Sequence, residues 1–117
     1  MSKIKHPSDV NRIYICGMIS NLPMQVAKDN FEAVEQYLME NFDYEIINPM
    51  KLPHYHDKSW QSYMKHCLLA MMNCNMIYVM GNHKLSNGAT IENKIAKVLG
   101  FHFIKRNKDL ENKLLPF

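Results

Sequence analysis

The sequence predicts an α/β fold in which a parallel sheet of four to five strands carries helices on both faces. Short runs rich in β-branched and aromatic residues alternate with longer segments whose apolar residues recur at helical spacing. Glycine, asparagine and proline stand where the short runs end, as expected for strands that turn into loops. At 117 residues the whole chain is predicted to be a single domain with one sizeable core.

The first half of the chain contains two predicted strands and one helix. Residues 1–10 are polar and are expected to form a loose lead-in. Residues 12–16 are β-rich and stop at Gly17, which predicts the first strand; residues 44–47 are predicted as the second. A helix is predicted over residues 23–41. Its core face is formed by apolar residues at helical spacing, namely Ala27, Phe31, Val34 and Leu38.

The next helix is predicted to begin at the N-cap residue Ser59 and to continue to about Asn73. Its middle, residues 67–72, carries no charged or amide side chain and is apolar on every side. A helix of this kind is buried on more than one face. In a domain this small we expect the second face to meet another subunit, giving a homodimer or higher homo-oligomer through helix 60–73.

The last part of the chain returns to the sheet. Residues 76–80 are too apolar for an edge strand and are predicted as an internal third strand. A helix is predicted to begin near Gly88 and to end at Gly100, followed by a fourth strand over residues 101–104. Ligands of such folds bind beyond the carboxyl ends of the strands. The loops expected there cover residues 17–21, 48–51 and 81–89.

Glu92 is the main candidate for chemistry. Its side chain is expected to lean back over Gly88 and Ala89, whose small size leaves open space in front of the carboxylate. The residues three and four positions further on are apolar, so no cation ties it down. We expect the helix N-terminus to keep it ionised. A nucleophile or a ligand anchor is presented in this way, whereas the simpler interpretation is a glutamate that only complements the helix dipole.

Composition and charge exclude several classes of function. A net charge of +3, with no basic cluster denser than Lys105–Lys108, indicates no groove for a nucleic-acid polymer. No apolar run is long enough to cross a membrane, and the N-terminus lacks the apolar core of a secretion signal. The three cysteines form no disulfide framework and are expected to be reduced thiols in the cytoplasm.

The loop sequences indicate neither a cofactor nor a metal. Residues 17–20 match neither a dinucleotide fingerprint nor a P-loop, although Ser20 can hold a ribose or a phosphate, or simply form a turn. Residue types that zinc accepts gather in one region, namely His54, His56, His66 and Cys67. Their spacing matches no standard site, so no metal is expected. A Cys/His catalytic pair that uses Cys16 or Cys67 is a further, unspecific alternative.

Five short motifs follow one another at residues 13–20, 48–50, 60–64, 74–78 and 86–92. Together they resemble the nucleoside 2-deoxyribosyltransferase-like superfamily, and within it a small branch common in phage and bacterial genomes that is related to deoxynucleoside 5′-monophosphate N-glycosidases. The resemblance covers residues 12–104. It implies a Rossmann-like or flavodoxin-like domain that forms a dimer or larger oligomer, in the cytoplasm of a bacterium or a phage-infected host.

The resemblance also implies an activity. In that superfamily the glutamate of an S-x-G-x-x-x-E motif, here Glu92, attacks the anomeric carbon of a nucleoside or nucleotide. Water or a second base then opens the sugar ester, which gives N-glycosidic cleavage or deoxyribosyl transfer on a (deoxy)nucleoside or its 5′-monophosphate. Tyr14 lies beside the nucleophile in relatives and is expected to orient it. The matching loops supply the candidate substrate-binding residues, namely Gly17, Met18, Ser20, Asn48, Ser86 and Gly88.

The sequence departs from the family pattern at positions that, in relatives, hold the substrate or help the base to leave. Met18 and Asn75 replace a usual Pro and Asp, Cys67 stands where nucleotide-cleaving relatives carry an Asp, and Ser20 stands where hydrolases use an Arg. An acid that helps the leaving base contributes about a hundredfold or more. Two alternatives therefore stay open: a nucleotide-binding or sequestering protein with weak or no catalysis, and an interaction protein that uses the Met-rich helix 60–73.

Overall fold

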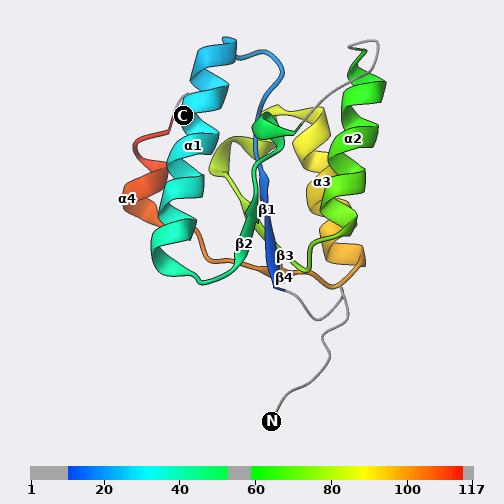
Figure 1. The fold of residues 1–117 in the computed structure, drawn as a ribbon. Coiled ribbons are helices and arrows are strands. Elements are labelled where there is room, and N and C mark those ends of the chain that lie inside the picture. The colour runs from blue at the N-terminus through cyan, green and yellow to red at the C-terminus, as the bar shows by residue number, and fades with distance from the viewer. Residues whose placement is uncertain (1–10, 53–58, 115–117) are drawn as a thin grey trace.

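The computed structural model of the protein describes residues 11–52 and 59–114 (Figure 1). The predicted lead-in, His54 and His56 lie outside the described residues. The elements follow in the order β1 (Arg12–Cys16), α1 (Met24–Asn41), β2 (Glu45–Ile47), the 3-10 helix η2 (Pro49–Lys51), α2 (Trp60–Met72), β3 (Met76–Val79), the 3-10 helix η3 (Gly81–Leu85), α3 (Asn87–Val98), β4 (His102–Phe103) and α4 (Lys108–Glu111).

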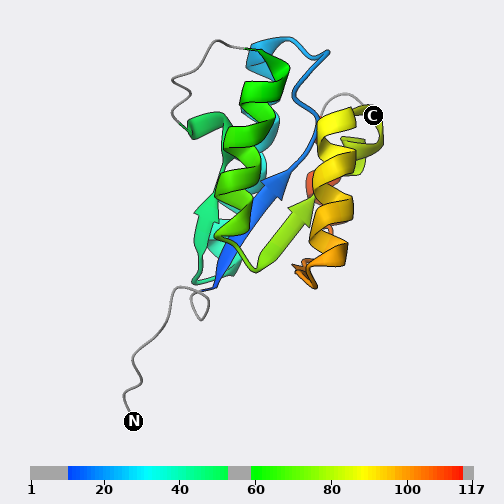
Figure 2. The same cartoon turned by 90° about the vertical axis from the view of Figure 1, so that its right-hand side faces the viewer.

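The four described strands form one parallel sheet in the order β2-β1-β3-β4. Helices α1 and α4 cover one face of it, and α2 and α3 cover the other (Figures 1 and 2). The strand order is that of the first four strands of a flavodoxin-like sheet. The predicted fold class is therefore confirmed, and β3 is an internal strand as its apolar sequence predicted.

Alternation along the strands divides the core between the two faces. On β1, Ile13 and Ile15 pack into the cluster that contains the buried residues of α1, whereas Tyr14 and Cys16 pack into the cluster beneath α2 and α3. All four side chains are fully buried. Tyr14 is therefore a core residue of the α2/α3 face, and its hydroxyl needs a partner on that side.

The helix ends agree closely with the sequence. The Ser59 hydroxyl accepts a hydrogen bond from the Ser62 N–H at 3.1 Å, and the Ser86 hydroxyl accepts one from the Ala89 N–H at 3.2 Å. Gly100 follows α3 with a φ of +74°, a left-handed conformation that glycine adopts without strain. These caps fix where α2 and α3 start and stop, and with them the position of Glu92.

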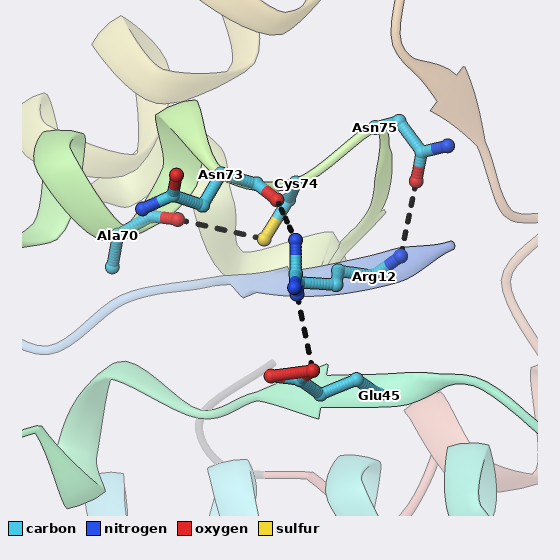
Figure 3. Close-up of polar contacts among 6 residues, drawn as sticks. All are labelled: Arg12, Glu45, Ala70, Asn73, Cys74 and Asn75. Carbon is cyan, nitrogen blue, oxygen red and sulfur yellow. Dashed lines mark hydrogen bonds and ion pairs between the residues drawn. The ribbon is translucent and has the colours of Figure 1, made fainter. Parts of the chain in front are cut away.

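Arg12 links neighbouring segments at the end of the sheet where the parallel strands begin (Figure 3). Its backbone N–H donates to Asn75 Oδ1 at 3.0 Å, its Nη1 donates to the Asn73 carbonyl at 3.1 Å, and its Nε pairs with Glu45 at 3.0 Å. These contacts connect the first residues of β1 and β2 with the turn that precedes β3. Asn75 thus has a structural role at the edge opposite to the carboxyl ends of the strands.

The exposed residues in the second half of α2 are apolar, as predicted for residues 67–72, whereas Gln61 and Lys65 are exposed in its first half. Leu69 is 68% exposed and Met72 is 48% exposed, while Met64, Cys67 and Met71 on the inner side are buried. The three cysteines, Cys16, Cys67 and Cys74, are free and buried. Among the described residues, none of the helices combines the length and the hydropathy needed to cross a bilayer.

Candidate active site

The candidate site lies where the chain leaves the sheet in two directions. After β1 the chain passes to α1 on one face, and after β3 it passes through η3 to α3 on the other face (Figure 1). This divergence between adjacent parallel strands is a topological switch point, where α/β folds bind ligands. The position agrees with the loop prediction for residues 17–21 and 81–89.

Tyr14 and Glu92 meet at this point. The Tyr14 hydroxyl donates a hydrogen bond of 2.8 Å to Glu92 Oε2, although the two residues are far apart in sequence. Tyr14 is fully buried and Glu92 is only 5% exposed. In the described part of the chain no lysine, arginine or histidine lies within ion-pair distance of the Glu92 carboxylate. The two predicted catalytic residues therefore form a buried pair that no cation neutralises.

Burial changes the acidity of Glu92. It raises the pKa of the carboxyl from 4.5 to about 7, and the hydrogen bonds from Tyr14 and Cys16 offset only part of this rise. Glu92 is therefore less readily ionised than expected, because burial disfavours the charged form. It also lies in the second turn of α3, beyond the first turn in which the helix dipole acts most strongly. The pKa of Tyr14 is raised by burial and by the neighbouring carboxylate, so its hydroxyl keeps its proton.

The open space expected in front of Glu92 is largely filled. Its cavity has a volume of about 20 Å³, enough for about one water molecule. The Met64 sulfur lies 2.9 Å from the position that a Cβ on Gly88 would occupy, so the missing side chain makes room for methionine. The cavity is lined by four predicted substrate-binding residues, Gly17, Ser20, Ser86 and Gly88, and by Cys67, which was named only as an alternative catalytic residue. Its other lining residues were not predicted as site residues, namely Ile19, Trp60, Tyr63, Met64 and Ala89.

Two of the predicted substrate-binding residues lie elsewhere. The Met18 side chain is buried, and its backbone N–H donates to Asn82 Oδ1 at 3.0 Å. Asn48 caps η2 by accepting a hydrogen bond from the Met50 N–H at 2.9 Å, and its amide donates to Glu35. Asn48 therefore shapes the loop after β2 and does not line the Glu92 cavity.

Two larger hollows flank the Glu92 cavity. One, of about 230 Å³, is mostly apolar and is lined by Ile19, Met24, Lys28, Met50 and Tyr63. The other, of about 270 Å³, is more polar and is lined by Ser20, Asn21, Trp60, Ser86 and Asn87, beside the N-terminus of α3. Each shares residues with the central cavity, so an apolar and a more polar hollow both adjoin the cavity that Glu92 lines.

The sequence matches a family described as a domain of unknown function, DUF4406, over residues 11–105. The chain belongs to the DUF4406 family. No curated protein and no solved structure matches the chain. The DUF4406 match contains every residue of the Glu92 cavity and ends before α4.

In this DUF4406 domain, Asn75 and Cys67 stand at the two positions where the family resemblance implies an Asp, and only Cys67 lies at the cavity. Asn75 is bonded to Arg12 at the far edge of the sheet, so its identity does not affect the chemistry of the cavity. Cys67 does line the cavity; burial and the Glu92 charge raise its pKa to about 12, so it stays a protonated thiol. Trp60, Met64 and Cys67 share one face of α2 at helical spacing, which is the sequence signal that could have identified this wall.

The DUF4406 domain holds no metal-type cluster in its described part. In residues 11–52 and 59–114, no three His, Cys, Asp or Glu side chains are placed to hold one ion together. His83 is buried in η3, and its Nδ1 lies 2.9 Å from the Met80 carbonyl, which accounts for one ring nitrogen. The ionisable groups at this site are Glu92 and Cys67 in the cavity wall, with Tyr14 bonded to Glu92 behind it, beside the hydroxyls of Ser20, Tyr63 and Ser86.

Proposed function

We propose that this protein cleaves the N-glycosidic bond of a (deoxy)nucleoside or its 5′-monophosphate, or transfers the deoxyribosyl group to another base. Glu92 is the nucleophile and Tyr14 orients it. The observation that carries the proposal is the 2.8 Å hydrogen bond between Tyr14 and a buried Glu92 that has no cationic partner among the described residues. The resemblance to the nucleoside 2-deoxyribosyltransferase-like superfamily supplies the reaction class.

The proposed reaction has two steps. A Glu92 oxygen bonds to the anomeric carbon while the bond to the base breaks, and the base leaves with the electron pair and takes a proton from solvent. Water or a second base then attacks the same carbon and releases the carboxylate. Only ionised Glu92 is nucleophilic, and Tyr14 favours that form because its O–H bonds the carboxylate.

The flanking compartments support a nucleoside-like substrate. The apolar compartment beside Tyr63 suits a flat base, and the polar compartment beside Ser20 and Ser86 suits a hydroxyl or phosphate at the other end of a sugar. The anomeric carbon would then lie over Glu92. Met64 has to move for this, and methionine is a flexible side chain that adapts to such changes.

A second candidate, a nucleotide-binding or sequestering protein without significant catalysis, is favoured by one observation. Glu92 is the sole carboxylate among the described residues that line the cavity, and the position of the expected acid is taken by the protonated thiol of Cys67. A leaving base then receives no proton from the protein. The two candidates share the binding site and differ in whether product forms.

A screen of nucleosides and nucleoside monophosphates tests both candidates. Thermal shift reports binding, and mass spectrometry reports free base. The proposal expects base release that Glu92→Gln abolishes and that Cys67→Asp increases, while Glu40→Gln, at an exposed glutamate near the end of α1, changes nothing. Binding without product in all variants would establish the second candidate. No binding across the panel would leave only an interaction protein.

We also propose that the protein acts as a homo-oligomer in the cytoplasm. The exposed Leu69 and Met72 form an apolar face on α2, which another copy of the chain would cover. Free, buried cysteines suit a reducing compartment. Loss of the oligomer on changing this face, described below, tests the assembly separately from the chemistry.

A further inference from the structure

A second and larger cavity lies between η3 and α4. Its volume is about 530 Å³, within the range of small-molecule sites, and it shares no lining residue with the Glu92 cavity or its two flanking hollows. Figure 1 places α4 beside α1, on the face of the sheet opposite to α2 and α3. The cavity also combines η3 with a segment after residue 105, beyond the DUF4406 match.

The lining of this cavity is largely apolar and carries a net positive charge. Lys84, Arg106 and Lys108 contribute three positive charges, and Glu111 contributes the one negative charge. No carboxylate in the described part of the chain lies within ion-pair distance of any of these three cations. Cations that converge on a hollow without an acidic partner attract an anionic ligand.

The carboxylate of Glu111 is already used by the fold. Its Oε1 accepts a hydrogen bond of 2.8 Å from the Gly81 N–H, and its Oε2 accepts one of 2.6 Å from the Tyr78 hydroxyl. These two bonds fasten α4 to β3 and to the start of η3, and they hold the cavity walls together. Glu111 thus has a structural role. Because its carboxylate is bonded to Gly81 and Tyr78, the three cations remain available to a ligand.

Two polar side chains in the cavity wall are each held by one hydrogen bond and keep other donors without a protein partner among the described residues. Arg106 Nε donates to the Val79 carbonyl at 2.6 Å, which anchors the guanidinium while its terminal nitrogens have no protein partner among the described residues. Asn82 Oδ1 accepts from the Met18 N–H, but its Nδ2 is buried and has no hydrogen-bond partner. Because this nitrogen is itself buried, it does not face the cavity, and contacts with a ligand are left to the three cations.

We propose that this cavity binds a small organic phosphate monoester. The phosphoryl oxygens are held by Arg106, Lys84 and Lys108, since guanidinium and ammonium groups form charge-assisted hydrogen bonds with phosphate. The organic part lies against the apolar walls, to which Leu85 and Leu114 contribute. This second site is distinct from the proposed reaction site and does not depend on Glu92.

Phenyl phosphate is the probe that tests this site, with amide chemical shifts of the full chain as the readout. We expect saturable changes at residues 81–85 and 106–112. Inorganic phosphate should bind more weakly because it lacks the apolar part, and phenol should not bind because it lacks the anion. Glu92→Gln should bind phenyl phosphate as the wild type does, which separates this site from the proposed reaction.

Variants complete the test. Arg106→Gln, Lys84→Gln and Lys108→Gln should each weaken binding about tenfold, the effect of one charge-assisted hydrogen bond. Lys113→Gln removes a neighbouring exposed cation that does not line the cavity and should leave the affinity unchanged. The proposal is overturned if the shifts do not saturate, if they occur only at residues 17–20 and 86–88, or if all four variants lose affinity equally.

Discussion

The replacement Glu92→Gln is expected to stabilise the protein, and by an amount that depends on pH. The raised pKa means that between about pH 4.5 and 7 the folded protein keeps a proton that the unfolded chain has already released. Stability is therefore lost as the pH rises through this window and is constant above it. Each pKa unit corresponds to about 1.4 kcal/mol, so the rise from 4.5 to about 7 corresponds to about 3 kcal/mol at pH 8.

Glutamine has the same shape, stays neutral and can still accept the hydrogen bond from the Tyr14 hydroxyl. The difference in free energy of unfolding between variant and wild type should thus be near zero at pH 4.5 and should reach about 3 kcal/mol in favour of the variant at pH 8. For a domain of this size that difference corresponds to roughly 12 °C in Tm.

Urea or thermal unfolding of both proteins in the same series of buffers measures this difference, because all other titrating groups contribute equally to both. Glu40→Gln, at an exposed position of α1, is the matched control for the removal of a surface glutamate. A Glu92→Gln difference that is flat across pH 4.5 to 8, or a variant that is less stable at pH 8, would refute a buried carboxyl with a raised pKa.

Three further predictions follow from the same contacts. Tyr14→Phe removes the bond that favours ionised Glu92, so the acidic limb of the kcat/KM profile should move up by about one to two pH units, measured as base release against pH. Leu69→Glu places a charge on the exposed face of α2 and should dissociate the oligomer in analytical ultracentrifugation; a monomeric wild type would contradict the proposed interface. Gly17→Ala brings a Cβ within 2.7 Å of the buried Met80 side chain and should cost about 1–3 kcal/mol in unfolding free energy, whereas an unchanged Tm would show that Met80 yields freely.

Much of the fold could be predicted because local signals and packing agree. Ser59 and Ser86 cap helices that also carry apolar faces, and the uniformly apolar β3 fits only an internal strand. The juxtaposition of Tyr14 and Glu92 was expected from the family resemblance. Its physical reason is alternation, since Tyr14 faces the side of the sheet that α3 covers.

The remaining features depend on distances that a sequence pattern does not contain. Whether Glu92 is ionised depends on the balance between burial, which raises its pKa, and the hydrogen bonds from Tyr14 and Cys16, which lower it. The space above Gly88 depends on Met64, whose sulfur fills it. Asn48 has the residue type of a ligand-binding loop, but its amide completes a cap on η2 instead. The cavity between η3 and α4 could not be foreseen, because it brings together cations from two segments separated by the whole of α3 and β4.

The central claim is that Glu92 attacks the anomeric carbon of a nucleoside-like substrate, and covalent capture tests it most directly. A 2′-fluorinated nucleoside or nucleoside monophosphate slows release of the sugar ester because fluorine destabilises the cation-like transition state. Peptide mass spectrometry after incubation should find the fluorosugar on the peptide that contains Glu92, and Glu92→Gln should carry none. A folded wild-type protein that releases base but carries the sugar elsewhere, or that carries no sugar with any member of the panel, would contradict the account.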